Sequence, residues 1–161
     1  MENRRKELLQ KLWSAQDEAY ELMAEYDSLP HTYGSVVLYQ AEALVVNLIG
    51  EHSDITITEL GSILKKTASA CSQIVRKLKS KGLVEQVRNE SNNRQLNLRL
   101  TDAGKQIYLD RLSLNLECQN ILFQMLQEFS DEEIAHHIAV QERINQAYRG
   151  DIDRSKISVT D

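Results

Sequence analysis

The chain has 161 residues, of which 42% are hydrophobic, with one proline and six glycines. This composition suits one folded domain and argues against a sandwich of many short strands. The longest apolar run, "ALVVNLIG", is too short to cross a bilayer and no signal-peptide pattern opens the chain, so we expect a cytoplasmic protein without membrane contact.

The first half of the chain is predicted to be helical. Apolar residues recur at helical spacing up to about Leu29, which indicates one long amphipathic helix. The segment "DSLPHTYGS" then breaks the helical pattern, and a second helix is expected over "VVLYQAEALVVNLIGEH", ending near Gly50. Thr56 and Glu59 have the spacing of a capping box, which predicts a third, short helix in "TITELGSILKK".

The fourth predicted helix, "TASACSQIVRKLKSKG", has two contrasting sides. Thr67 is its expected N-cap and Gly82 its end. Residues on its opposite sides recur at helical spacing: the apolar set Cys71, Ile74, Val75 and Leu78, and the polar set Ser69, Ser72, Gln73 and Arg76. We therefore expect one side to lie in the core and the other to be free to form hydrogen bonds.

Two strands are predicted after this helix, "LVEQVR" and "QLNLRL", joined by a polar loop. In the second strand Leu96, Leu98 and Leu100 alternate with polar residues, which is typical of a half-buried strand.

Two further helices are expected to close the chain. The first begins at Thr101 and is apolar on more than one face, so it needs several partners. The second begins at a capping box of Ser130 and Glu133, and the polar tail after Gly150 is expected to fray.

Charge is distributed unevenly along the chain. Between Thr58 and Lys105 ten Lys and Arg residues accompany four Asp and Glu residues, a net charge of +6, which leaves −11 for the rest of a chain whose total is −5. A basic middle between acidic ends is compatible with one face that meets a polyanion. A solvated helix face is the alternative interpretation of the same charge run.

Short helices followed by a two-stranded hairpin predict a mainly α fold, a winged helix-turn-helix in which the last helix before the hairpin enters the major groove of DNA. A polar finger beside that helix can cross the phosphate backbone. An arginine at its tip can enter the minor groove, where the potential is most negative.

At this point the sequence resembles the MarR family of bacterial transcription regulators, on "ITITELGSILKKTASACSQIVRKLKSKGLVEQV" and the following "RNESNNRQLNLRLTDAG". "KGLV" and "LTDAG" stand where the family has a similar turn and an LT-x-x-G motif. The resemblance implies that Arg94 is the wing-tip arginine and that polar residues of the fourth helix face the major groove. The predicted DNA-contacting set is Thr67, Ser69, Ser72, Gln73, Arg76, Lys77 and Arg94.

The wing tip departs from the family pattern. Asn92, Asn93 and Arg94 replace an Asp-Arg-Arg-like triplet, so Asn92 offers Arg94 only a neutral and weaker hydrogen bond.

The resemblance also implies how the chain is organised. We expect a single MarR-like domain over residues 1–161, with residues 36–105 as the DNA-binding part and residues 1–30 and 106–150 as N- and C-terminal dimerisation helices. The implied function is a homodimeric repressor that binds a pseudo-palindromic double-stranded operator and responds to a small-molecule effector. The alternative is a winged-helix module for protein–protein assembly, distinguished by the absence of sequence-specific DNA binding.

Other residues with reactive side chains have simpler interpretations. Cys71 and Cys118 lie on apolar stripes, so we interpret both as core residues rather than redox sensors. Neither cysteine matches a metal or disulfide spacing. The neighbouring His136 and His137 point in different directions on a helix and are interpreted as surface or dimer-interface residues. No catalytic motif is evident, so neither an enzyme nor a cofactor is expected.

Two questions stay open on the sequence alone. The fold could bring His31 and His52 together in a metal site. Trp13, Tyr20 and Tyr39 could line an effector pocket, although aromatic residues at helical spacing are more often part of a core.

Overall fold

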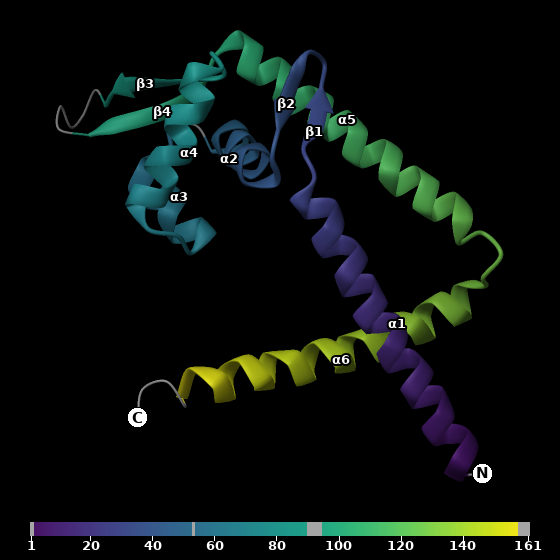
Figure 1. The fold of residues 1–161 in the computed structure, drawn as a ribbon. Coiled ribbons are helices and arrows are strands. Elements are labelled where there is room, and N and C mark those ends of the chain that lie inside the picture. The colour runs from purple at the N-terminus through teal and green to yellow at the C-terminus, as the bar shows by residue number, and fades with distance from the viewer. Residues whose placement is uncertain (1, 53, 90–94, 158–161) are drawn as a thin grey trace. The chain divides into compact units, whose positions relative to one another are not determined.

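A computed structural model describes residues 2–52, 54–89 and 95–157. It confirms the mainly α fold with a two-stranded wing and with N- and C-terminal helices. The elements in chain order are α1 (Glu2–Ser28), β1 (His31–Tyr33), β2 (Val36–Leu38), α2 (Gln40–Glu51), α3 (Ile57–Leu64), α4 (Ala68–Ser80), β3 (Val84–Arg88), β4 (Leu96–Leu100), α5 (Asp102–Met125) and α6 (Asp131–Ile157) (Figure 1).

A short hairpin, β1–β2, separates α1 from α2. The second predicted helix is present as α2, but its predicted start at Val36 was wrong because Val36–Leu38 is a strand. Val36–Leu38 pairs antiparallel with His31–Tyr33, with Tyr33 opposite Val36. The two-residue turn between them starts at Gly34, whose φ of 57° lies in the left-handed region that glycine adopts without strain. The apolar run Val36–Leu38 is too short for its periodicity to distinguish a strand from a helix. In the structure α2 begins at Gln40.

The helices α2, α3 and α4 enclose the core of the winged part. Leu38, Val45, Val46, Leu60 and Leu78 are fully buried there. The predicted capping box begins α3, since the Thr56 N–H donates to Glu59 Oε2 at 2.8 Å and the Glu59 N–H donates to Thr56 Oγ1 at 3.2 Å. Because these bonds favour the ionised carboxylate, the backbone N–H of Thr56 holds the pKa of Glu59 below its usual value.

The wing is an antiparallel pair, β3 and β4, with Val84 opposite Leu100 and Arg88 opposite Leu96. The expected alternation holds at Leu98 and Leu100, which are buried, but it fails near the tip. Leu96 is 46% exposed, whereas Asn97 is only 5% exposed.

Pairing with a third segment explains the burial of Asn97. Asn97 forms a bridge with Thr56, and the Leu98 N–H donates to the Ile55 carbonyl at 2.8 Å. Asn97 Oδ1 also accepts from the Asn89 side chain at 3.2 Å. A buried side-chain amide is tolerated where hydrogen bonds satisfy it.

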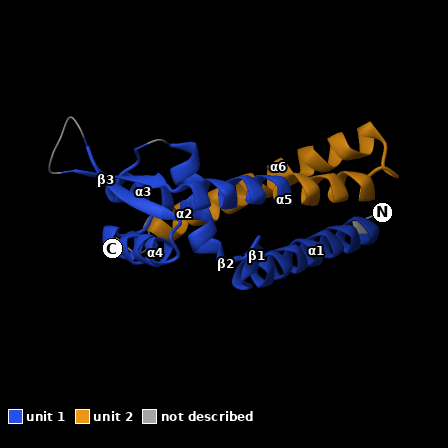
Figure 2. Cartoon of the chain, turned by 90° about the horizontal axis from the view of Figure 1, so that it is seen from above, with its two compact units in different colours: residues 1–114 blue, residues 115–161 orange. Residues whose placement is uncertain are grey.

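Two compact units divide the chain at Leu114 and Asn115, inside α5 (Figure 2). In the first unit, Thr101 begins α5 as expected, because its Oγ1 accepts from the Gly104 N–H at 3.0 Å. In the second unit, the Ser130 N–H donates to Glu133 Oε2 at 2.9 Å, which confirms the capping box that starts α6.

The expected fraying after Gly150 was wrong, because α6 continues to Ile157. Ion pairs one turn apart, Asp151 with Arg154 and Asp153 with Lys156, accompany the final turns. Gly150 therefore lies inside this helix.

The terminal helices expose many large apolar side chains within the single chain. On α1, Trp13 is 63% exposed and Tyr20 is also exposed; on α5, Met125 is 70% exposed. Cys118 is exposed as well, so its assignment to the core was wrong. Within the described ranges, no helix combines the length and the apolar character that a membrane span requires.

Candidate DNA interface

The helix predicted to recognise DNA, α4, begins at Thr67 as expected. Thr67 Oγ1 accepts from the Ala70 N–H at 3.2 Å, which satisfies one of the amides left free at a helix start. Thr67 is exposed, and its hydroxyl hydrogen stays available as a donor. The tight connection from α3 uses Lys65 in a left-handed conformation, with φ of 52°.

The two predicted sides of α4 separate as the spacing required. Cys71, Val75 and Leu78 are buried and Ile74 is partly buried. Of the predicted contact residues that lie within α4, four are exposed and Ser72 is intermediate; the exposed ones are Ser69, Gln73, Arg76 and Lys77. The outward side of α4 therefore presents hydroxyl, amide and cationic groups that can bind the edges of bases or phosphates.

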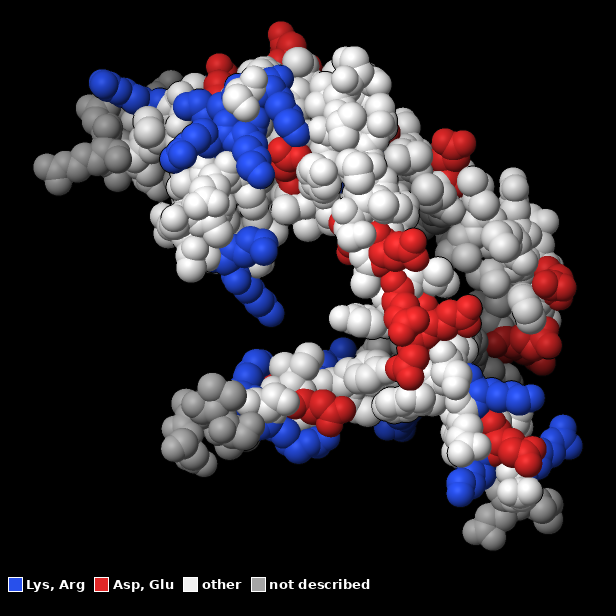
Figure 3. All heavy atoms as spheres, viewed as in Figure 1, with Lys and Arg blue, Asp and Glu red and all other residues white. Residues whose placement is uncertain are grey.

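The α4 side chains continue onto the wing. Ser72, Arg76 and Lys79 line a shallow hollow together with Gln86 on β3. Lys79 Nζ donates to Gln86 Oε1 at 2.8 Å, which ties the last turns of α4 to the first wing strand. Lys and Arg residues gather over the part of the structure where Figure 1 labels α4, β3 and β4 (Figure 3).

Several cations of the basic middle segment hold partners within the protein. Lys81 pairs with Glu42, Arg99 with Asp54, and Lys105 with Asp102. The sequence count of +6 therefore includes charges that serve the fold as well as charges that face solvent.

The root of the wing is anchored by Asp54, which has a left-handed φ of 65°. Arg99 Nε donates to Asp54 Oδ1 at 2.6 Å. This hydrogen bond from Arg99 holds the pKa of Asp54 below its ordinary value of 3.8. The tip residues Asn92, Asn93 and Arg94 lie outside the described residues, so the minor-groove contact of Arg94 stays a prediction.

Cys71 is fully buried beneath this interface, as expected for a core residue. Burial raises the pKa of its thiol, so the reactive thiolate is disfavoured. This environment is that of a structural cysteine.

His31 packs against Tyr26 at the end of α1. His31 Nε2 lies 3.1 Å from the Tyr26 carbonyl, and its ring lies 4.3 Å from the Tyr26 ring, centroid to centroid. Among the described residues, no group of three or more His, Cys, Asp and Glu side chains is arranged to hold a metal ion.

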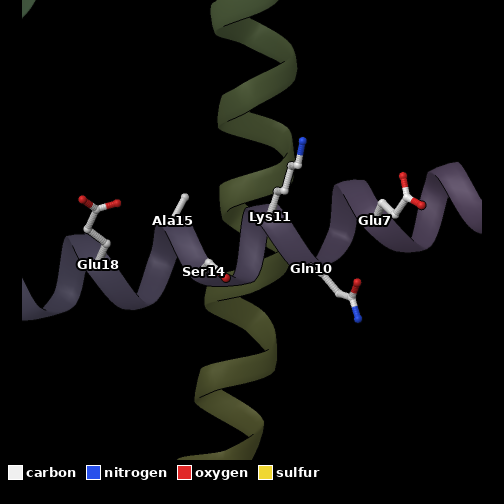
Figure 4. A pocket seen from close by; sticks show the side chains of 6 residues that line it. All are labelled: Glu7, Gln10, Lys11, Ser14, Ala15 and Glu18. Carbon is white, nitrogen blue, oxygen red and sulfur yellow. The ribbon is translucent and has the colours of Figure 1, made fainter.

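One hollow along α1 is lined by residues of that helix alone, namely Glu7, Gln10, Lys11, Ser14, Ala15 and Glu18 (Figure 4). Figure 4 shows these side chains spread along several turns instead of converging on one point. A mixed, non-convergent set of this kind offers no site for catalysis or for a small ligand.

Two buried polar groups were not anticipated. Arg111 on α5 is only 8% exposed, and its Nη1 has no hydrogen-bond partner among the described residues. Asn47 Oδ1 on α2 is in the same situation. The two helices meet where Gly50 lies against the Tyr108 ring, since a Cβ on Gly50 would come within 2.8 Å of that ring. Asn47 and Arg111 lie about one helical turn from this contact on their own helices.

Sequence reasoning also missed the ion pairs of Lys81 with Glu42 and of Arg99 with Asp54. The members of each pair are separated by 39 and 45 residues, and no local pattern connects them. Lys81 and Arg99 were recognised only as positive charges.

The order of these elements, the outward polar side of α4 and the adjoining wing define a winged helix-turn-helix fold. The MarR family model matches residues 39–95, which span α2, α3, α4, β3 and the wing tip. Over this segment, about a third of the chain, the sequence is similar to the MarR family.

Solved MarR-family structures share the fold along nearly the whole chain. The DNA complex of FabT from Streptococcus pneumoniae has a TM-score of 0.69 at 21% identity, covering 88% of this chain and 98% of FabT. The zinc-responsive ZitR of Lactococcus lactis has a TM-score of 0.72 at 15% identity, covering 87% of this chain and 99% of ZitR. At these identities the likeness supports the fold alone. No curated protein matches the sequence.

Proposed function

We propose that this chain is a sequence-specific DNA-binding repressor that acts as a homodimer. The observation that carries the proposal is the outward side of α4, where Ser69, Gln73, Arg76 and Lys77 are exposed while Cys71 on the opposite side is fully buried. In this proposal residues 36–105 bind DNA, with Ser69, Ser72, Gln73 and Arg76 at base edges and Thr67 and Lys77 at phosphates. Arg94 enters the adjacent minor groove.

The dimer is proposed from the apolar surface of the terminal helices. Monomeric soluble proteins rarely expose large contiguous apolar patches. Residues 1–30 and 106–150 contribute exposed Trp, Tyr, Phe, Leu and Met side chains on α1 and α5, and exposed Ile and Val side chains at the start of α6. Association of two copies would remove this surface from water and place two α4 helices on half-sites ~34 Å apart. Light scattering at micromolar concentration should give about twice the chain mass of 18.5 kDa.

A small-molecule effector is proposed on a separate observation. Arg111 is a buried cation whose Nη1 has no partner among the described residues, and such a group is costly unless an acceptor satisfies it. A small aromatic acid would supply that acceptor. Thermal-shift measurements with aromatic acids, metals and oxidants test this part, and a shift with an acid that Arg111→Met abolishes would support it.

The test of DNA binding is a mobility shift on the DNA upstream of the protein's own gene, repeated at several salt concentrations. Affinity should fall steeply with salt, as expected for a protein that neutralises phosphates. A folded dimer that binds no DNA in this assay would favour the alternative function, a protein–protein assembly module.

Binding-site selection separates the two proposed arginine contacts. Arg76→Ala should relax base preference at one position in each half-site, because a bidentate contact to guanine carries ~1–3 kcal/mol of discrimination. Arg94→Ala should weaken binding to all sites and disfavour A-tract flanks while leaving the core motif unchanged. The opposite pattern would contradict the proposed docking.

A further inference from the structure

A partly buried ion pair joins the end of the proposed recognition helix to the start of the winged part. Lys81 caps the C-terminal end of α4. Its Nζ lies 2.8 Å from each carboxylate oxygen of Glu42 on α2 and 2.9 Å from the Val37 carbonyl on β2. One side chain thus connects the end of α4 to β2 and to α2, which are neighbours in the sequence and lie 44 and 39 residues before Lys81 at the two contacts.

Glu42 is held on its other side as well. The Tyr39 N–H donates to Glu42 Oε2 at 3.0 Å, and the Glu42 side chain is only 7% exposed. A carboxylate this deeply buried depends on its cation, because removing one partner of a buried pair leaves the other charge uncompensated. The pair therefore fixes where α4 ends relative to the first turn of α2.

The geometry leaves Lys81 without a free donor. A lysine ammonium has three hydrogens, and Lys81 has three acceptors, the two Glu42 oxygens and the Val37 carbonyl. A phosphate contact would require breaking one of these bonds. Lys77, one turn earlier on α4, is exposed and makes no ion pair within the described part of the chain. Lys77 is therefore available to contact phosphate, whereas Lys81 is engaged within the protein.

We propose that Lys81 and Glu42 are positioning residues for DNA recognition, which hold α4 at the angle that presents its outward side to the major groove. The pair acts on affinity through the orientation of α4, and Lys81 neutralises no phosphate. This inference rests on the proposed DNA-binding function.

The dependence of affinity on salt distinguishes a positioning residue from a phosphate contact. Each phosphate neutralised contributes about 0.9 to the slope of log affinity against log salt on double-stranded DNA. The test compares Lys81→Gln, Glu42→Gln and the double variant with Lys77→Gln as the matched control. Mobility shifts are measured at a temperature at which circular dichroism shows each variant folded.

Lys81→Gln and Glu42→Gln should each lower affinity about tenfold or more with an unchanged salt slope, and the double variant should bind no worse than either single variant. Lys77→Gln should reduce the slope by about 1 per protomer. Lys81→Arg, which keeps a cation able to reach a carboxylate, should recover most of the affinity lost in Lys81→Gln.

Hydrogen exchange on the free protein provides a readout without DNA. Lys81→Gln should speed amide exchange in Val37–Glu42 and in the last turn of α4 but not in α3. The inference is overturned if Lys81→Gln lowers the salt slope while Glu42→Gln binds normally, or if exchange is unchanged. If the parent protein binds no DNA at any salt concentration, the proposed function fails first and the positioning role fails with it.

Discussion

Among the glycines of the chain, Gly104 is the one at which a substitution by alanine is predicted to destabilise the fold most. An ideal Cβ at this position would lie 2.0 Å from the Leu83 carbonyl oxygen and 3.3 Å from the Leu100 Cβ. Because real Cβ atoms essentially never come within 3.0 Å of another heavy atom, the start of α5 and the residue before β3 would have to separate by about 1 Å.

The hydrogen bonds at this junction set the size of the effect. The Thr101 N–H donates to the Leu83 carbonyl at 3.1 Å, and the Thr101 hydroxyl donates to the Gly82 carbonyl at 2.6 Å. Overpacking costs ~1–3 kcal/mol, and each weakened bond adds ~0.5–1.5 kcal/mol. The higher helix propensity of alanine offsets at most ~1 kcal/mol. The unfavourable terms sum to ~2–6 kcal/mol. After subtraction of ~1 kcal/mol for helix propensity, Gly104→Ala should destabilise the protein by about 1–5 kcal/mol.

Two other glycines serve as controls for this substitution. Gly82 has a φ of 72° but no atom within 4 Å of its ideal Cβ, so Gly82→Ala should cost only the ~1–2 kcal/mol of the left-handed conformation. Gly150 lies inside α6 with Arg154 Nη1 3.5 Å from the ideal Cβ, so Gly150→Ala should stabilise that helix by up to ~1 kcal/mol.

Thermal and urea denaturation at one fixed protein concentration measure all three variants, since association makes the midpoint depend on concentration. The expected order of stability is Gly150→Ala, parent, Gly82→Ala, Gly104→Ala. A Gly104→Ala variant as stable as Gly82→Ala would refute the steric argument.

Three further predictions follow from the caps, the buried thiol and the wing anchor. Thr67→Ala removes the acceptor of the Ala70 N–H and should cost ~1 kcal/mol in urea denaturation; an unchanged midpoint would contradict this. Cys71 should react with a thiol reagent only on unfolding, and Cys71→Ser should destabilise the core by ~1–3 kcal/mol without altering any response of DNA binding to peroxide. Because Arg99 lowers the pKa of Asp54, their pairing should stabilise the fold above the unfolded value of 3.8 and lose this effect as pH falls through the lower native pKa; a carboxyl NMR titration that gives 3.8 or more would exclude it.

Local signals in the sequence were sufficient to place most helix boundaries. The capping boxes at Thr56 and Ser130 and the end of α4 near Gly82 depend on residues within one turn of each other, so their spacing carries the information. The LT-x-x-G match likewise has a physical cause, because Gly104 permits the close approach to Leu83 that an alanine would prevent.

Features that depend on contacts between distant segments were not predictable in this way. Asn97 was expected to face solvent from its alternation, yet its bridge to Thr56 places it in the core. The β1–β2 hairpin had one local signal, Gly34 between two short runs of β-favouring residues, but three-residue strands are too short to show a period. Helical spacing also identified the apolar faces of α1 and α5 without indicating that the single chain leaves them exposed.

The charge pattern likewise combines a local signal with contacts between distant segments. These contacts determine which cations are expected to contribute to DNA affinity. The positive net charge of residues 58–105 indicated where the DNA interface would lie. A count of charges, however, gives every cation the same weight. Lys81 has all its donors engaged, and Lys79, Arg99 and Lys105 bond to neighbouring side chains. In the described part of the chain, the cations of this segment without a bonded side-chain partner are Lys65, Lys66, Arg76, Lys77 and Arg88. Because phosphate contacts set the salt dependence of binding, Lys65, Lys66, Lys77, Arg88 and Arg94 should carry most of it. Arg76 is proposed to contact a base edge instead, and the paired cations act through the fold that positions them.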